Sequence, residues 1–253
     1  CIEILKGDQL LIVDAGTGLL TLSPEKIATR KRFDILLTHL HFDHVQGLGF
    51  FNPLFNPLCE VHIYGPAGSS GSLQNRLKRY LSPPLFPVHF RDLPCQIHLH
   101  EVSHSSFEIG KLRINSNYIL HPGPTVGYRI SDGNHVLSYF PDHEPVLDRN
   151  GWKVGDEWIS GMGLARSADL LIHDSQYTSD EYESRVGWGH SSIEVAIKFA
   201  IRARVKKLLL FHHDPNHQDT DLEKSFNDHL RDKTYDFQIE LAREGMVIDL
   251  DGG

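Results

Sequence analysis

Short runs of apolar residues recur along the chain, and polar or turn-forming residues separate them. The runs hold four to nine residues and are rich in Leu, Ile, Val, Phe and Tyr, which is typical of buried or half-buried strands. They occupy residues 1–5, 9–13, 33–37, 61–64, 112–120, 126–130, 135–139, 168–172, 208–211 and 237–241. The pattern predicts a chain built around many short strands, with hairpin turns at Lys6-Gly7-Asp8 and Asp132-Gly133.

The clearest helical spacing lies in residues 193–201, where apolar side chains recur every three or four positions. Ser191 and Glu194 predict a capping box at the start of this helix. Shorter helices are expected after Ser23, within 73–81, after Thr178 and within 222–230. The mixture predicts an α/β protein, and 253 residues suffice for one sizeable core, so we expect a single domain over 1–253.

Composition narrows the function classes. A formal net charge of −8 argues against a protein built for non-specific nucleic-acid binding. Three cysteines make no disulfide framework, so we expect a reducing, cytoplasmic setting. No apolar run approaches the roughly 20 residues of a membrane helix, so no membrane partner is expected, while a homodimer stays open. The chain starts at Cys1 instead of Met, and we expect a missing N-terminal strand.

The most informative segment is Thr38–His44, which follows a predicted buried strand. It holds three imidazoles and one carboxylate, the ligand types that zinc and similar divalent ions prefer. His39 and His41 are two residues apart, so both can project to the same side at the end of a strand. Asp43 and His44 follow, where the backbone turns, and can point at a second position. This one segment therefore predicts ligands for two metal ions.

An apolar strand followed by His or Asp recurs later in the chain. The residues in these positions are His121, Asp142, Asp174 and His212. A sheet that gathers such strand ends at one edge would make a cleft lined by metal ligands. His212 and His213 compete for one role, because the alternation of a strand sends neighbours in different directions.

Residues His39–His44 resemble the His-x-His-x-Asp-His signature of the metallo-β-lactamase superfamily, and the resemblance extends over nearly the whole chain. It implies a four-layer αβ/βα sandwich with a metal site at one edge. It also implies that Asp14 hydrogen-bonds the ligand loop and that His212, not His213, ends the last ligand strand. The implied ligands are His39, His41 and His121 for one ion, Asp43, His44 and His212 for the other, and Asp142 as the bridge between them.

Two divalent ions about 3.5–4 Å apart can hold a hydroxide between them, which suits in-line attack on a phosphodiester. Zinc is the expected metal because the ligands are rich in histidine, whereas the carboxylates leave manganese or iron open. We expect Asp43 to be a catalytic residue as well as a metal ligand. The resemblance thus implies a binuclear metal-dependent hydrolase.

His190 is the candidate proton donor for the leaving group, since it lies at the start of the predicted helix over 193–201. A helix N-terminus disfavours a cation, so a carboxylate partner is needed, and Asp174 is the candidate. The contexts Ile172-His173-Asp174 and Gly189-His190-Ser191 resemble the superfamily branch of tRNase Z and phosphoribosyl cyclic phosphodiesterase. In that branch a His before Ser or Thr aids departure of the leaving group.

The substrate is the open question. True tRNase Z proteins carry His-Glu-Ala-Thr where this chain has His173-Asp174-Ser175-Gln176, and a long basic arm that residues 65–94 do not match. We therefore expect a small cyclic or diester phosphate. The alternatives are an RNA 3′-processing endonuclease acting on tRNA and a non-catalytic metal-binding sensor.

We expect His143 to be a neighbour of the site. Histidines expected at the surface or in packing are His62, His89, His98, His100, His104, His135 and His217.

Overall fold

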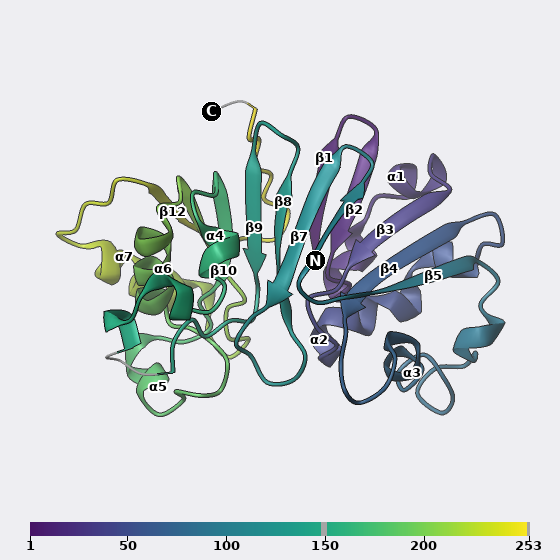
Figure 1. Cartoon of the computed structure of the whole chain (residues 1–253), viewed down its shortest axis with the longest axis horizontal. Helices are drawn as coiled ribbons and strands as arrows, with labels where there is room; N and C mark the ends of the chain where they lie inside the picture. Colours follow the sequence, from purple (N-terminus) through teal and green to yellow (C-terminus); the bar gives the residue numbers. More distant parts are fainter. Residues whose placement is uncertain (148–150, 252–253) are drawn as a thin grey trace. The chain divides into compact units, whose positions relative to one another are not determined.

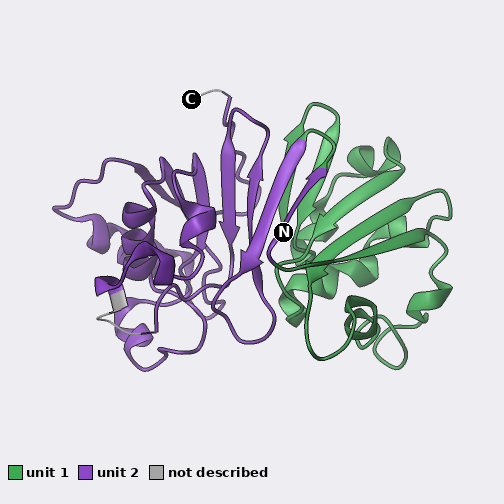
Figure 2. Ribbon diagram, in the orientation of Figure 1, with its two compact units in different colours: residues 1–103, 109–111 green, residues 104–108, 112–253 purple. Residues whose placement is uncertain are grey.

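The computed structural model describes residues 1–147 and 151–251. The chain forms two compact units (Figure 2). Unit 1 comprises residues 1–103 and 109–111, and unit 2 comprises residues 104–108 and 112–253. Each unit has a β-sheet and a buried apolar core of its own, so each is described separately. That the whole chain is one domain stays a prediction.

The sheet of unit 1 has the strand order β1-β2-β3-β4-β5 (Figure 1). Its strands are β1 (Ile2–Lys6), β2 (Gln9–Val13), β3 (Arg32–Leu36), β4 (Glu60–Pro66) and β5 (Gln96–Val102). The first pair is the antiparallel hairpin that the sequence predicts, and β2 to β5 run parallel. Its helices are α1 (Pro24–Ala28), α2 (Phe42–Val45) and α3 (Leu73–Leu77).

The two faces of this sheet differ in polarity because side chains alternate along each strand. Ile35 of β3 and Val61 and Ile63 of β4 lie on one face, in the buried apolar cluster of unit 1. The residues between them point to the opposite face, where β3, β4 and β5 place Asp34, His62 and His98 in register. The sequence β3–loop–α2 carries the motif of residues 38–44 past the carboxyl end of β3.

The sheet of unit 2 has the strand order β12-β11-β10-β9-β8-β7-β6. Its strands are β6 (Ser105–Ile109), β7 (Leu112–Tyr118), β8 (Val126–Ser131), β9 (Val136–Phe140), β10 (Leu170–Asp174), β11 (Lys207–Phe211) and β12 (Gln238–Leu241). β7, β8 and β9 pair antiparallel, whereas β9 to β12 run parallel. Its helices are α4 (Met162–Ala165), α5 (Ser179–Glu183), α6 (Ile193–Ala203) and α7 (Asp219–Leu230).

Helix α6 packs against β10 and β11 and fills the core of unit 2 with Ile193, Ile197 and Phe199. The capping residue differs from the prediction. Ser192 is the N-cap, because its hydroxyl accepts from the backbone N–H of Val195, while the hydroxyl of Ser191 donates to a backbone carbonyl elsewhere. Among the described residues, no helix combines the length and the apolar composition that crossing a membrane requires.

Candidate metal centre

Asp14 organises the ligand loop of unit 1. Its carboxylate is buried and accepts from the backbone N–H of Thr38 (2.8 Å) and from the Thr38 hydroxyl (3.0 Å). His44 Nδ1 lies 2.9 Å from the other carboxylate oxygen. Burial by itself would raise the pKa of Asp14, but the neighbouring His44 and the Thr38 hydrogen bond outweigh it, so the pKa is lowered. Asp14 thereby fixes the entry to the loop and the orientation of one of its imidazoles.

The imidazoles of this loop converge. The ring centroids of His39 and His41 are 4.4 Å apart, and those of His39 and His44 are 4.2 Å apart. His44 Nε2 lies 3.2 Å from Asp43 Oδ2. His39 and His44 are buried, while His41 and Asp43 are exposed. Unit 1 therefore brings the four predicted ligands of its motif together.

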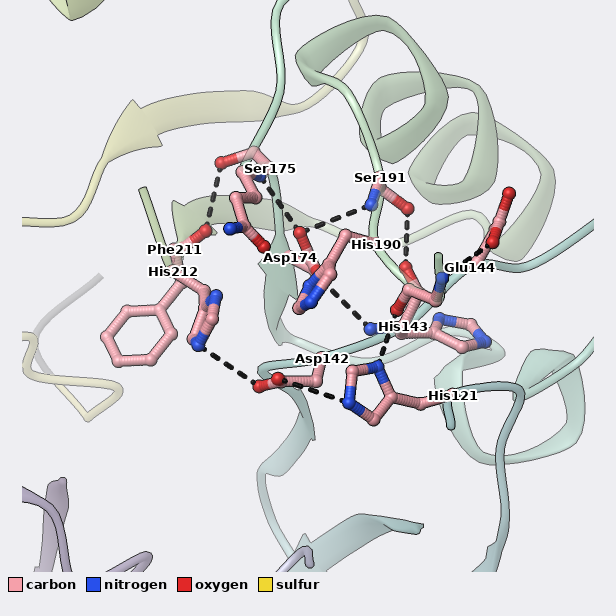
Figure 3. A network of polar contacts seen from close by, with 12 residues as sticks. His121, Asp142, His143, Glu144, Asp174, Ser175, His190, Ser191, Phe211 and His212 are labelled. Atoms are coloured by element: carbon pink, nitrogen blue, oxygen red, sulfur yellow. Dashed lines mark hydrogen bonds and ion pairs between the residues drawn. The ribbon is translucent and has the colours of Figure 1, made fainter. Parts of the chain in front are cut away.

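Unit 2 brings a second set together at the carboxyl ends of its strands (Figure 3). Asp142, just beyond β9, directs one carboxylate oxygen toward His121 Nε2 (3.6 Å) and the other toward His212 Nε2 (3.3 Å). Ligand atoms of Asp142, His190 and His212 lie within 4.8 Å of one another. A carboxylate whose two oxygens face different imidazoles has the disposition of a bridging ligand.

His212 and His213 point in different directions, although both lie beyond the end of β11, where strand alternation no longer applies. His212 has φ +58°, a left-handed backbone that a bulky residue seldom adopts, and its ring faces Asp142 (Figure 3). His213 Nδ1 instead lies 3.5 Å from the hydroxyl of Ser175. Strained backbone is commonly retained where it positions a functional group, so the geometry favours His212 as the ligand.

The second nitrogen of several imidazoles is held by the protein. His39 Nδ1 contacts the Thr38 hydroxyl (3.1 Å), and His44 Nδ1 contacts Asp14. His121 Nδ1 donates to the carbonyl of Gly189 (2.8 Å). Metal-bound histidines are typically held in this way, because the outer partner fixes the ring and leaves Nε2 for the metal. The donor set and its supports therefore fit a zinc-like divalent ion.

His190 and Asp174 form the contact that the sequence predicts. Asp174, buried at the end of β10, accepts from His190 Nδ1 at 2.7 Å. It also accepts from the backbone N–H groups of His143 (3.0 Å), Gln176 (2.9 Å) and Ser191 (3.3 Å). With Nδ1–H committed to this carboxylate, Nε2 is the nitrogen of His190 that can exchange a proton.

Glu144 is a site residue that the sequence did not single out. Its side chain is buried and accepts from the backbone N–H groups of Gly187 (2.9 Å) and Gly189 (2.9 Å) and from the Tyr182 hydroxyl (2.8 Å). Both glycines have φ near +90°. A Cβ on Gly189 would lie 2.6 Å from His121 Nδ1, so only glycine fits there. Glu144 thus holds the loop that delivers His190.

His143 is a neighbour of the site, as expected. Its Nδ1 lies 2.9 Å from His173 Nε2, and its Nε2 lies 3.1 Å from the Ser160 hydroxyl. Burial lowers the pKa of His143 well below the usual range and lowers the pKa of His173 to about 4. Both rings are therefore neutral near pH 7, and Nδ1 of His173 lies 2.7 Å from the backbone carbonyl of Asp174.

Comparison with known proteins identifies the family. The profile of the β-lactamase superfamily domain matches residues 10–213. This chain belongs to that superfamily. Ribonuclease Z of Thermococcus gammatolerans is 27% identical over 245 residues, which cover 81% of this chain and 74% of the relative. Ribonuclease Z of Thermococcus sibiricus is 29% identical over 255 residues, which cover 86% of this chain and 81% of the relative.

Solved structures share the fold. The metallo-β-lactamase fold protein YhfI from Bacillus subtilis superposes with a TM-score of 0.70 at 20% identity, over 98% of this chain and 90% of that one. The short form of human tRNase Z gives a TM-score of 0.66 at 20% identity, over 98% and 90%. A diphosphatase from the PhnP family gives 0.66 at 19%, over 96% and 81%. The family profile confirms the predicted superfamily, a hydrolase family, and the solved structures confirm its α/β fold.

Proposed function

We propose that this chain is a phosphodiesterase that uses two divalent metal ions. His39, His41 and His121 would hold one ion, and Asp43, His44 and His212 the other. Asp142, whose oxygens face His121 and His212 separately, would bridge them. The observation that carries the proposal is the set of outer contacts that fix His39, His44 and His121 with Nε2 directed away from their supports.

Divalent ions bound by these residues would lower the pKa of water toward about 7 and would offset the charge of a phosphodiester in the transition state. The residues of the chain then provide positioning and proton transfer. Asp174 accepts a hydrogen bond from Nδ1–H of His190 and stabilises the imidazolium form. The imidazolium gives its Nε2 proton to the departing oxygen. Asp14 and Glu144 hold the two loops that carry these groups.

We propose RNA as the substrate, cut on the 3′ side as a ribonuclease Z would cut it. The relatives named ribonuclease Z and the tRNase Z neighbour support this alternative better than the small phosphodiester that we expected from the sequence. Zinc as the metal, a cytoplasmic location and a homodimer stay predictions.

A small phosphodiester remains the second candidate, because residues 67–95 in unit 1 do not resemble an arm that binds tRNA. This segment carries α3, and its apolar side chains Leu73, Leu77, Leu81 and Phe86 are buried in the core of the unit. A segment that packs onto its own unit differs from the long basic arm that tRNase Z uses for tRNA. The net charge of −8 also weakens any general attraction to RNA.

The test compares a precursor tRNA with a 3′ trailer, bis(p-nitrophenyl) phosphate and cyclic nucleotides, each with Zn²⁺ or Mn²⁺. Release of the trailer, with a KM that rises steeply with salt, would support the RNA substrate. Turnover of the small diesters with intact precursor tRNA would support the second candidate. Asp142→Asn should reduce either activity at least 100-fold, while the exposed control His104→Gln should not. Failure to hydrolyse any of these substrates with either metal would overturn both.

A further inference from the structure

A second group of metal-ligating side chains lies on the polar face of the sheet of unit 1. In parallel register, Asp34 of β3 is beside His62 of β4, and His62 is beside His98 of β5. One step further along the strands, Tyr64 is beside His100. The sequence interpretation assigned these histidines to ordinary surface or packing roles. Their register places them in contact.

Two of these histidines, His62 and His98, converge on the carboxylate of Glu60, the first residue of β4. Glu60 Oε1 lies 2.7 Å from His62 Nε2 and 3.3 Å from His98 Nε2. The rings of His62 and His98 stack with centroids 4.5 Å apart and planes 15° apart. Ligand atoms of the three residues all lie within 4.8 Å of one another. His62 and His98 therefore each direct Nε2 toward the same carboxylate oxygen of Glu60.

The surroundings suit an ion. His62 Nδ1 lies 3.0 Å from Nε2 of His100, within hydrogen-bonding distance. A hydrogen bond from His62 Nδ1–H to His100 leaves His62 Nε2 as a lone-pair donor. The side chains of Glu60 and His98 are 41% and 44% exposed, so an ion can reach the site from solvent.

We propose that Glu60, His62 and His98 bind a divalent transition-metal ion of the zinc type, with water completing its coordination. Two imidazoles and one carboxylate are a common donor set for such ions, at about 2.0–2.2 Å. To coordinate a metal, each imidazole must offer an unprotonated Nε2, so binding is expected to weaken as the pH falls. The ion joins β4 to β5, the edge strand of the sheet, and so ties down that edge.

This site shares no residue with the proposed catalytic centre. Asp34, beside His62, lies within β3, whereas His39 follows the end of that strand. The inference therefore stands whether or not the chain is a phosphodiesterase.

The test is Zn²⁺ binding to the full chain, measured by competition with a chelating dye and by metal analysis after dialysis. Wild type should hold one more Zn²⁺ per chain than His98→Ala or Glu60→Gln. Where a variant still binds this additional Zn²⁺, wild type should bind it at least 10-fold more tightly. The exposed histidine control His104→Gln should match wild type. Both site variants alter exposed side chains, so they should fold, and their hydrolytic activity should equal that of wild type.

A second measurement guards against non-specific binding. Micromolar Zn²⁺ should raise the thermal midpoint more in wild type than in His98→Ala, because only wild type gains the link between β4 and β5. Equal stoichiometry, affinity and thermal shift in wild type and both variants would overturn the proposal. Binding that appears only at millimolar Zn²⁺ would also overturn it.

Discussion

Asp174 accepts four hydrogen bonds while almost fully buried, and one of them fixes the tautomer of His190. We predict that Asp174→Asn lowers kcat by roughly 10²–10⁴-fold with little change in metal content, because the amide cannot stabilise the imidazolium. His190→Gln should cost a similar amount. The double variant should be no worse than the more damaged single variant, since the two residues act as one unit. Effects on kcat that multiply would contradict a shared role in proton transfer.

The buried His173 should make the chain sensitive to mild acid. Its pKa is lowered from 6.5 to about 4 by burial, so between these values the unfolded state binds a proton that the folded state does not. Stability from this group is complete above pH 6.5 and is lost as the pH falls toward 4, by roughly 3 kcal/mol in total.

Urea unfolding at pH 7.5, 6, 5 and 4.5 measures the effect. Over this range His173→Gln should lose less unfolding free energy than wild type, whatever its starting stability. The exposed control His104→Gln should follow the wild-type slope. Parallel slopes for His173→Gln and wild type would mean that His173 is not the group that titrates.

At the scale of elements, the loop between α5 and α6 depends on Glu144. We predict that Glu144→Gln lowers the unfolding free energy by about 1–3 kcal/mol, because the amide group cannot accept all the donors that the carboxylate satisfies. Amide hydrogen exchange at Gly187 and Gly189 should accelerate, while exchange in α7 should not change. The exposed control Glu244→Gln should show neither effect. Unchanged exchange at both glycines would refute this role.

The sequence predicts those parts of the fold and site that depend on local pattern. The motif of residues 38–44 and the strand ends at His121, Asp142 and His212 are visible because each follows an apolar run. Glu144 is not visible, since its partners Gly187 and Gly189 lie more than 40 residues away. Its one local signal is an acid directly after the pair Asp142-His143.

Two further differences have physical reasons. Strand β5 was not singled out, although Ile97 and Leu99 alternate with its polar residues, because its histidines gain meaning only beside β4. The cap of α6 was placed one residue early because Ser191 and Ser192 are equivalent in a sequence pattern. The structure separates them, since the Ser191 hydroxyl donates to the His143 carbonyl and leaves Ser192 to cap the helix.

At the scale of the whole molecule, the proposed function requires ligands that are far apart in the sequence to share ions. That requirement predicts metal stoichiometry rather than activity. In a Glu60→Gln background, which removes the further site, the parent chain should hold two Zn²⁺. His44→Ala and His212→Ala remove ligands of the same proposed ion, so each should leave one Zn²⁺, and so should the double variant.

The matched comparison pairs residues assigned to different ions. His39→Ala with His212→Ala should lose both Zn²⁺, because each substitution removes a ligand of a separate ion. Each lost ion should also lower the unfolding free energy, by about 2.7 kcal/mol where free Zn²⁺ is 100 times its Kd. If instead His44→Ala with His212→Ala lost both ions, His44 and His212 would be ligands of different ions, and the proposed ligand assignment would be wrong even with hydrolysis intact.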